Sequence, residues 1–190
     1  ASVEHDKQKV VVFVGRLSHR DKRVDRLLRI WYLAQPRMSG WVLKIVGDGR
    51  EMNNLRALSS ALHLQAIYFE GQTNDVKQYY DEASILCLTS SFEGWPMSVA
   101  EAQSNGVIPV VFNSFLGAKE LIATESQGVL VRPFDESAFA EELVLLSADA
   151  QRMKQMQQRV VEKARKYAIN RTGEAWTKML DHLLDNTRGE

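Results

Sequence analysis

The 190-residue chain has 24 basic and 24 acidic side chains, so its formal net charge at pH 7 is zero. Because each nucleic-acid phosphate that a protein neutralises needs a Lys or Arg, this balance argues against sequence-independent nucleic-acid binding. With 45% hydrophobic residues and one cysteine, Cys87, the composition predicts a globular, cytoplasmic protein without an internal disulfide. No apolar run in the sequence reaches the roughly 18 residues needed to cross a bilayer.

Six short apolar runs alternate with segments of helical period and predict the strands of a sheet. Because these runs are continuously hydrophobic, they indicate strands that are covered on both faces, as in parallel sheets. The sequence therefore predicts a doubly wound, Rossmann-like α/β fold with a mostly parallel six-stranded sheet and C-terminal helices. The predicted strands are Val10–Val14, Val42–Val46, Ala66–Phe69, Ile85–Leu88, Val107–Val111 and Gly128–Val131.

Helical periodicity predicts helices between these strands and over most of the C-terminal part of the chain. Pro96 precedes one of them, and proline is favoured where a helix begins. No linker or low-complexity tract interrupts the pattern, so we take residues 1–190 as a single domain. The predicted helices are Val24–Ala34, Asn53–Leu64, Met97–Ser104, a segment beginning at Glu136, Met153–Tyr167 and Arg171–Leu184.

Two loops carry the residues expected to bind a ligand, because open parallel sheets bind ligands outside the carboxyl ends of their strands. After the first predicted strand, Gly15 is followed by Arg16, Arg20 and Lys22, which indicates a loop that binds an anion. The loop after the fourth strand carries Glu93. In the usual doubly wound order the first and fourth strands are neighbours, so we expect the two loops to face each other across one crevice.

The helix that begins at Met97 adds a second anion-binding feature to this crevice. The backbone N–H groups of Met97 and Ser98 have no partner within the helix, and the positive end of the helix dipole favours a phosphate. Glu101, about one turn further along, can accept hydrogen bonds from a diol such as a ribose. Cations beside separate carboxylates suit a ligand with both a diphosphate and sugar hydroxyls, which describes a nucleotide sugar.

Several short segments, taken together, resemble the C-terminal half of a glycosyltransferase family 4 enzyme of GT-B fold. Glu93 and Glu101 reproduce the family's spacing of two glutamates separated by seven residues. The resemblance runs from about Val10 to Tyr167. The segments that carry it are Gly15-Arg16-Leu17 with Lys22, Ile45-Val46-Gly47-Asp48-Gly49, Phe69-Glu70-Gly71, Glu93-Gly94-Trp95-Pro96 through Glu101-Ala102, Gly106-Val107-Ile108-Pro109-Val110 and Gly128-Val129-Leu130-Val131.

The resemblance implies a role for each candidate site residue. Arg16 and Lys22 would hold the donor diphosphate, with Arg20 able to share or replace the role of Lys22. Glu101 would bind the ribose, and Glu93 would bind the transferred sugar together with backbone amides of the following helix. Arg16, Lys22 and Glu93 are the catalytic candidates. The donor-binding candidates are Gly15, Arg16, Lys22, Glu93, Met97, Ser98 and Glu101.

The same resemblance implies a retaining hexosyltransferase that uses a nucleotide diphosphate sugar as substrate, with a UDP-sugar favoured. No cofactor is expected, and the absence of an Asp-x-Asp motif or a Cys/His cluster argues against a metal-bound diphosphate. The acceptor would be a saccharide or a lipid-linked saccharide in bacterial polysaccharide or lipopolysaccharide synthesis, at the inner face of the membrane through peripheral association. An N-terminal acceptor domain would be missing, so we expect this fragment to be inactive alone.

Three other functions are alternatives to this interpretation. A non-catalytic nucleotide-binding or scaffold module would keep the fold without turnover, and a nucleotide-sugar 2-epimerase shares the architecture. A nicotinamide dehydrogenase is disfavoured because no G-x-G-x-x-G follows the first strand. Gly47-Asp48-Gly49 is interpreted as a plain turn, because it follows the second strand and Met52 stands where the fingerprint needs its third glycine.

Overall fold

A single parallel sheet forms the centre of the computed structural model, which describes residues 7–165 and residue 177. Its six strands lie in the order β3-β2-β1-β4-β5-β6, and every adjacent pair is parallel. The doubly wound, Rossmann-like fold predicted from the sequence is therefore confirmed. The strands are β1 (Val10–Val14), β2 (Val42–Val46), β3 (Ile67–Gly71), β4 (Ile85–Leu88), β5 (Ile108–Phe112) and β6 (Val129–Val131).

Three predicted strands begin one residue too early, each for a local reason. Ala66 and Gly128 have φ angles of 50° and 143°, which extended strands do not adopt. The N–H of Val107 donates to the carbonyl of Ala102 at 2.9 Å, so this residue closes the end of the preceding helix. The strand cores themselves are where the apolar runs place them.

The helices connect the strands and then cover the sheet. The helix predicted at 53–64 ends at Ala61 in the structure, because His63 has a left-handed φ of 51°. The helix predicted at 153–167 already begins at Ala150 in the structure, because Asp149 caps it by accepting from the N–H of Arg152 at 2.8 Å. The predicted helix 171–184 lies outside the described residues. The helices are α1 (Val24–Ala34), η1 (Gln35–Arg37), α2 (Met52–Ala61), α3 (Lys77–Glu82), α4 (Met97–Ser104), α5 (Ala118–Leu121), η2 (Glu125–Gln127), α6 (Glu136–Ala148) and α7 (Ala150–Ala164).

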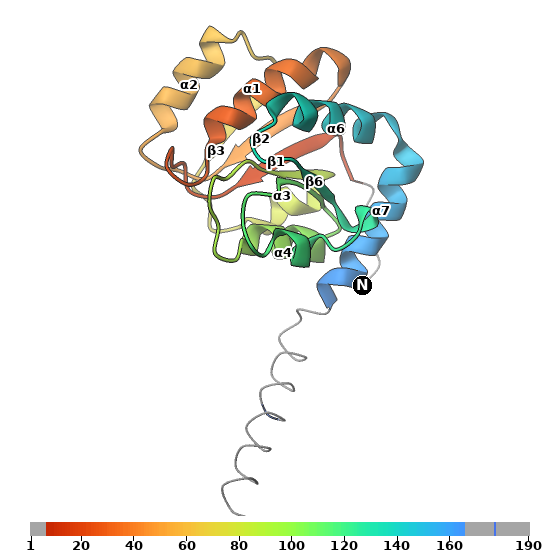
Figure 1. The fold of residues 1–190 in the computed structure, drawn as a ribbon. Coiled ribbons are helices and arrows are strands. Elements are labelled where there is room, and N and C mark those ends of the chain that lie inside the picture. Colours follow the sequence, from red (N-terminus) through yellow and green to blue (C-terminus); the bar gives the residue numbers. More distant parts are fainter. Residues whose placement is uncertain (1–6, 166–176, 178–190) are drawn as a thin grey trace, which may run out of the picture.

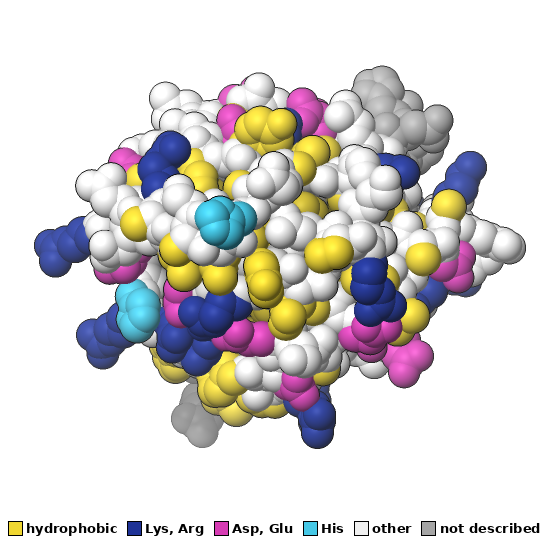
Figure 2. Space-filling view, turned by 90° about the horizontal axis from the view of Figure 1, so that it is seen from above, with side chains coloured by type: hydrophobic (Ala, Val, Ile, Leu, Met, Phe, Trp, Pro, Cys, Tyr) yellow, Lys and Arg dark blue, Asp and Glu magenta, His cyan; other side chains and the backbone are white. Residues whose placement is uncertain are grey.

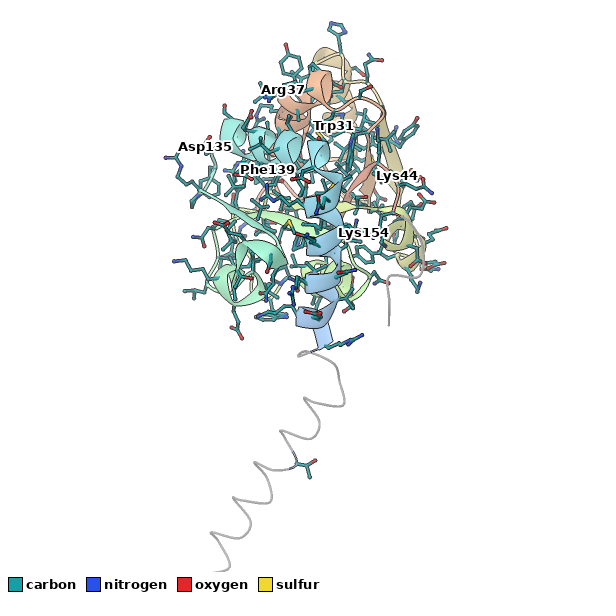
Figure 3. All side chains as sticks on the ribbon, turned by 90° about the vertical axis from the view of Figure 1, so that its right-hand side faces the viewer. Trp31, Arg37, Lys44, Asp135, Phe139 and Lys154 are labelled. Atoms are coloured by element: carbon teal, nitrogen blue, oxygen red, sulfur yellow. The ribbon has the colours of Figure 1, made fainter. Side chains whose placement is uncertain are left out.

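Helices cover both faces of the sheet, which explains the continuously apolar strands. Figure 1 shows α1, α2 and α6 on one side of the sheet and α3 and α4 on the other. Val11 and Phe13 of β1 belong to the core beneath α1 and α6, whereas Val10 and Val12 belong to the opposite core. Trp31 of α1 is 1% exposed and lies in the layer that α1 and α6 form (Figure 3). Each face of β1 is therefore buried.

The adjacency of β1 and β4 sets the position of the candidate site. Val11 pairs with Ile85 and Val12 with Leu86, so the loops that follow the two strands leave the sheet at the same end. This is the relationship expected from the doubly wound order. On the face seen from above in Figure 2, basic and acidic side chains lie among one another without a continuous area of either sign.

Candidate active site

Hydrogen bonds join the β1–α1 loop to the β4–α4 loop. The N–H of Ser91 donates to the carbonyl of Asp21 at 2.7 Å. The hydroxyl of Thr89, which is fully buried, donates to the carbonyl of Arg23 at 3.0 Å. Arg26 of α1 donates from Nη1 to Ser91 Oγ at 3.1 Å. The two loops therefore form one connected wall at the carboxyl end of the sheet.

Lys22 and Glu93 meet across the two loops. The distance between Lys22 Nζ and Glu93 Oε1 is 2.6 Å, and the side chains are only 20% and 9% exposed. Ser90 Oγ donates to the same carboxylate oxygen at 2.6 Å, and Ser114 Oγ donates to the carbonyl of Ser90 at 2.8 Å. Ser90 was not predicted as a site residue, although it stands three residues before Glu93 in the same loop.

The two arginines of the β1–α1 loop lie in more open surroundings than Lys22. The side chain of Arg16 is 74% exposed, and its Nη2 is 3.6 Å from Asp21 Oδ2. The side chain of Arg20 is 95% exposed, and its Nε is 4.0 Å from Asp21 Oδ1. Of the two candidates for the second cation, Lys22 is therefore the one that the structure brings to Glu93.

The start of α4 directly follows the loop that carries Glu93. Pro96 is its N-terminal cap residue, with extended backbone, and no side chain caps the helix. The N–H groups of Met97 and Ser98 are thus in the position where a helix accepts an external anion. Trp95, just before the helix, packs on Gly117, where an added Cβ would lie 3.3 Å from the indole ring.

Glu101 lies on the exposed face of α4 and receives one buried donor. Tyr80 Oη of α3 donates to Glu101 Oε2 at 3.0 Å. The phenol is buried, with Tyr80 2% exposed. Burial, together with the Glu101 charge, raises the pKa of Tyr80 well above its usual value, so the hydroxyl keeps its proton. The other carboxylate oxygen of Glu101 is left to accept from a ligand.

A cavity of about 340 Å³ opens beside the β1–α1 loop, at the carboxyl ends of β1, β2 and β3. Gly47 allows the loop after β2 to lie close to the backbone of Gly15, because a Cβ at position 47 would clash with the carbonyl oxygen of Gly15. Gln72 and Thr73 supply polar side chains from the segment after β3. Neither residue was predicted as a site residue, although both follow the carboxyl end of a predicted strand. The cavity is lined by Val14, Gly15, Arg16, Val46, Gly47, Asp48, Gln72, Thr73 and Val76.

Two other structural findings bear on the sequence expectations. Among residues 7–165 and 177, no group of three His, Cys, Asp or Glu side chains is arranged to hold a metal ion. In the same residues, no helix is both long enough and apolar enough to span a membrane. Cys87 is fully buried in β4, as predicted, and burial raises the pKa of its thiol above the usual range.

Residues 1–167 match the family model described as glycosyl transferases group 1, and the chain belongs to this family. It is 34% identical, over 90% of its length and 49% of the relative's, to an uncharacterised glycosyltransferase of Haemophilus influenzae. It is 30% identical, over 92% of its length and 48% of the relative's, to a Campylobacter jejuni α-1,4-N-acetyl-D-galactosaminyltransferase named for an undecaprenol-linked saccharide. The chain thus spans about half the length of these curated relatives.

Solved structures show the same fold. The lipopolysaccharide outer core galactosyltransferase WaaB, in its apo form, has a TM-score of 0.77 and 25% identity, with 95% of this chain and 52% of WaaB covered. The pneumococcal O-GlcNAc transferase GtfA, in complex with UDP and GlcNAc, has a TM-score of 0.82 and 19% identity, with 94% and 37% covered. The architecture is therefore that of GT-B glycosyltransferases, and relatives act in bacterial polysaccharide and lipopolysaccharide synthesis.

Proposed function

We propose that this chain is the donor-binding half of a retaining, metal-independent hexosyltransferase of glycosyltransferase family 4. One observation carries the proposal: Lys22 and Glu93, a cation and a carboxylate from loops that follow neighbouring strands, meet at 2.6 Å beside the start of α4. A diphosphate and a sugar attached to it need these two kinds of group within a few ångströms of each other.

The diphosphate would lie between the β1–α1 loop and α4. When the bond to the sugar breaks, negative charge grows on the β-phosphate and positive charge on the sugar ring. Lys22, Arg16 and the N–H groups of Met97 and Ser98 are the donors that would stabilise that phosphate charge. Glu93 would accept hydrogen bonds from the sugar hydroxyls. None of these roles requires a metal ion.

The nucleoside would occupy the region from Glu101 to the cavity beside Gly15. A volume of about 340 Å³ is within the usual range for ligand pockets, and Gln72 and Thr73 offer the polar contacts that a base needs. Glu101, positioned by Tyr80, would bind the ribose diol. The GtfA complex contains UDP, which supports a UDP-sugar as the donor for this chain.

We assign binding of the acceptor to a second domain. Because the relatives are about twice as long, we propose that an acceptor-binding domain completes the enzyme and that this half alone is inactive. The Campylobacter relative is named for an undecaprenol-linked saccharide, which supports a saccharide or lipid-linked acceptor. We place the enzyme in the cytoplasm, with peripheral association at the inner face of the membrane.

Calorimetric titration of the chain with UDP, GDP and ADP tests the donor-binding role. We expect a dissociation constant between about 1 μM and 1 mM for one of them, because the proposed second domain would supply the other wall of the cleft. The affinity should be unchanged in EDTA. A failure of all three to bind at millimolar concentration would contradict the proposal, and loss of binding in EDTA would contradict its metal-free form. Turnover by the full-length protein separates an enzyme from a non-catalytic nucleotide-binding module.

A further inference from the structure

The Lys22–Glu93 ion pair joins two residues whose proposed ligands are different parts of one donor molecule. Lys22 Nζ and Glu93 Oε1 are 2.6 Å apart. Lys22 is the proposed phosphate ligand and Glu93 the proposed sugar ligand. Each group is partnered by the other, so a phosphate that takes the N–H donated to Glu93, or a sugar hydroxyl that takes Oε1, competes with this contact.

The surroundings make this pair stronger than the Arg16–Asp21 contact of the β1–α1 loop. Glu93 is 9% exposed, whereas the side chains of the Arg16–Asp21 pair are 74% and 32% exposed and their charged atoms are 3.6 Å apart. Solvent screens an open pair and leaves it little net energy, but it screens a sheltered one much less. Releasing Lys22 from Glu93 therefore has an appreciable energetic cost.

The cost of this release depends on what Glu93 receives in exchange. If Lys22 turns to a phosphate, the hydroxyl of Ser90 is the hydrogen-bond donor that the nearly buried carboxylate keeps among residues 7–165. A buried charge that loses its partner is destabilised unless new donors replace it. The sugar of an intact donor supplies hydroxyl donors at this position. A nucleoside diphosphate has no sugar there and supplies none.

We propose that Glu93 is a specificity-determining residue, which uses its ion pair with Lys22 to weaken binding of the spent nucleoside diphosphate relative to the intact nucleotide sugar. This inference rests on the proposed donor-binding function. It extends that function, because the same carboxylate that holds the sugar also withdraws Lys22 from the diphosphate once the sugar has left. The expected consequence is faster release of the nucleoside diphosphate after transfer.

The central test measures UDP affinity after Glu93→Gln, a substitution that keeps the size of the side chain and removes its charge. We expect UDP to bind about three- to tenfold more tightly, because Lys22 is no longer held. The ratio of the dissociation constant of UDP to that of the tightest binder among UDP-glucose, UDP-galactose and UDP-N-acetylglucosamine should fall. Calorimetry on the purified chain gives both quantities.

Two further variants separate release of Lys22 from a general electrostatic effect. In a Lys22→Met background, Glu93→Gln should no longer tighten UDP binding, whereas simple repulsion between Glu93 and the phosphates would persist without Lys22. Glu82→Gln is the matched control: it breaks the Lys44–Glu82 pair, which has the same 2.6 Å separation but joins β2 to the end of α3. It should leave UDP affinity unchanged.

The outcomes distinguish this inference from the proposed function. If UDP binds the unsubstituted chain but Glu93→Gln leaves its affinity unchanged or weaker, the inference is wrong and the donor-binding role stands. Tightening that persists in the Lys22→Met background, or that appears equally with Glu82→Gln, also overturns it. If the unsubstituted chain binds neither UDP nor GDP nor ADP, the proposed function fails and the inference fails with it.

Discussion

Tyr80 donates a hydrogen bond from its buried phenol to the exposed carboxylate of Glu101, with 3.0 Å between Oη and Oε2. The donor comes from α3 and the acceptor from α4, two helices on the same side of the sheet. Because Tyr80 is 2% exposed, its position is fixed by packing, and it fixes one oxygen of Glu101 in turn. The carboxylate of Glu101, which is proposed to bind the ribose, is thus held in a defined orientation.

Tyr80→Phe should therefore weaken nucleotide binding although Tyr80 itself does not face the ligand. The substitution keeps the packed ring and removes a hydrogen bond worth about 0.5–1.5 kcal/mol, so we expect UDP affinity to fall about two- to tenfold. Tyr79→Phe is the matched control, since its hydroxyl lies 3.5 Å from Glu70 instead of Glu101. Equal effects of the two substitutions in calorimetric titrations would refute a positioning role for Tyr80.

Arg16→Ala should weaken UDP binding about tenfold or more, because a charge-assisted contact to phosphate is worth about 1.5–3 kcal/mol. The fold should be unaffected, since the side chain is 74% exposed. Arg20→Ala, at a residue whose side chain is 95% exposed, provides the control and should change the affinity little. A larger loss for Arg20→Ala than for Lys22→Ala would instead identify Arg20 as the second diphosphate cation.

Thr89→Val should destabilise the protein by about 0.5–1.5 kcal/mol, because the carbonyl of Arg23 loses a buried hydroxyl donor but keeps the N–H of Arg26 at 3.0 Å. Arg23 also has a left-handed backbone, with a φ of 50°, so this turn depends on contacts such as that from Thr89 to keep its shape. Urea unfolding gives the free energy change. Thr89→Ser restores the hydroxyl and should recover most of the stability; an equal loss in both variants would indicate a packing effect alone.

Asp25 should contribute to stability near neutral pH and lose that contribution in acid. Burial alone would raise the pKa of Asp25, but hydrogen bonds from Arg23 and Arg29 outweigh it and lower the pKa to about 2. An unfolded Asp has a pKa of about 3.9, so the stabilisation is present above that pH and is lost as the pH falls toward 2.

The measurement for Asp25 compares urea unfolding of the unsubstituted chain and Asp25→Asn at pH 6 and pH 3. At pH 6 we expect Asp25→Asn to be less stable by about 1–2 kcal/mol, and at pH 3 the difference should shrink. Asp81→Asn, which breaks an exposed pair with Lys77, should cost little at either pH. A difference that is constant between the two pH values would contradict the assignment.

The sequence was most informative where burial alone decides the structure. Strands such as Val10–Val14 and Ile85–Leu88 are covered on both faces, so their apolar runs coincide with the strands. The short helices α3 and α5 were not predicted, because six and four residues provide too little periodicity to detect. The prediction that strands begin at Ala66 and Gly128 was wrong, because the φ angles of these two residues depend on tertiary context.

The candidate site was also predictable from the sequence only in part. The chain order and the usual strand order were sufficient to place the β1–α1 and β4–α4 loops together, and thus Lys22 near Glu93. Their direct contact could not be predicted, because it joins side chains that are 71 positions apart. The cavity after β2 and β3 was also missed, since it depends on how closely the loop at Gly47 approaches Gly15. Side-chain geometry between distant segments has no local sequence signal.

The packing of Trp95 on Gly117 gives the crevice an optical reporter of its own. Trp95 is 40% exposed at the start of α4, whereas Trp31 and Trp41 are 1% and 5% exposed within the core. Indole emission depends on the polarity around the ring, so a nucleotide sugar that reaches the start of α4 would change the signal of Trp95 far more than that of Trp31 and Trp41. In a Trp176→Phe variant, which removes the fourth tryptophan of the chain, binding near the start of α4 can therefore be followed by intrinsic fluorescence, without a label or a coupled assay.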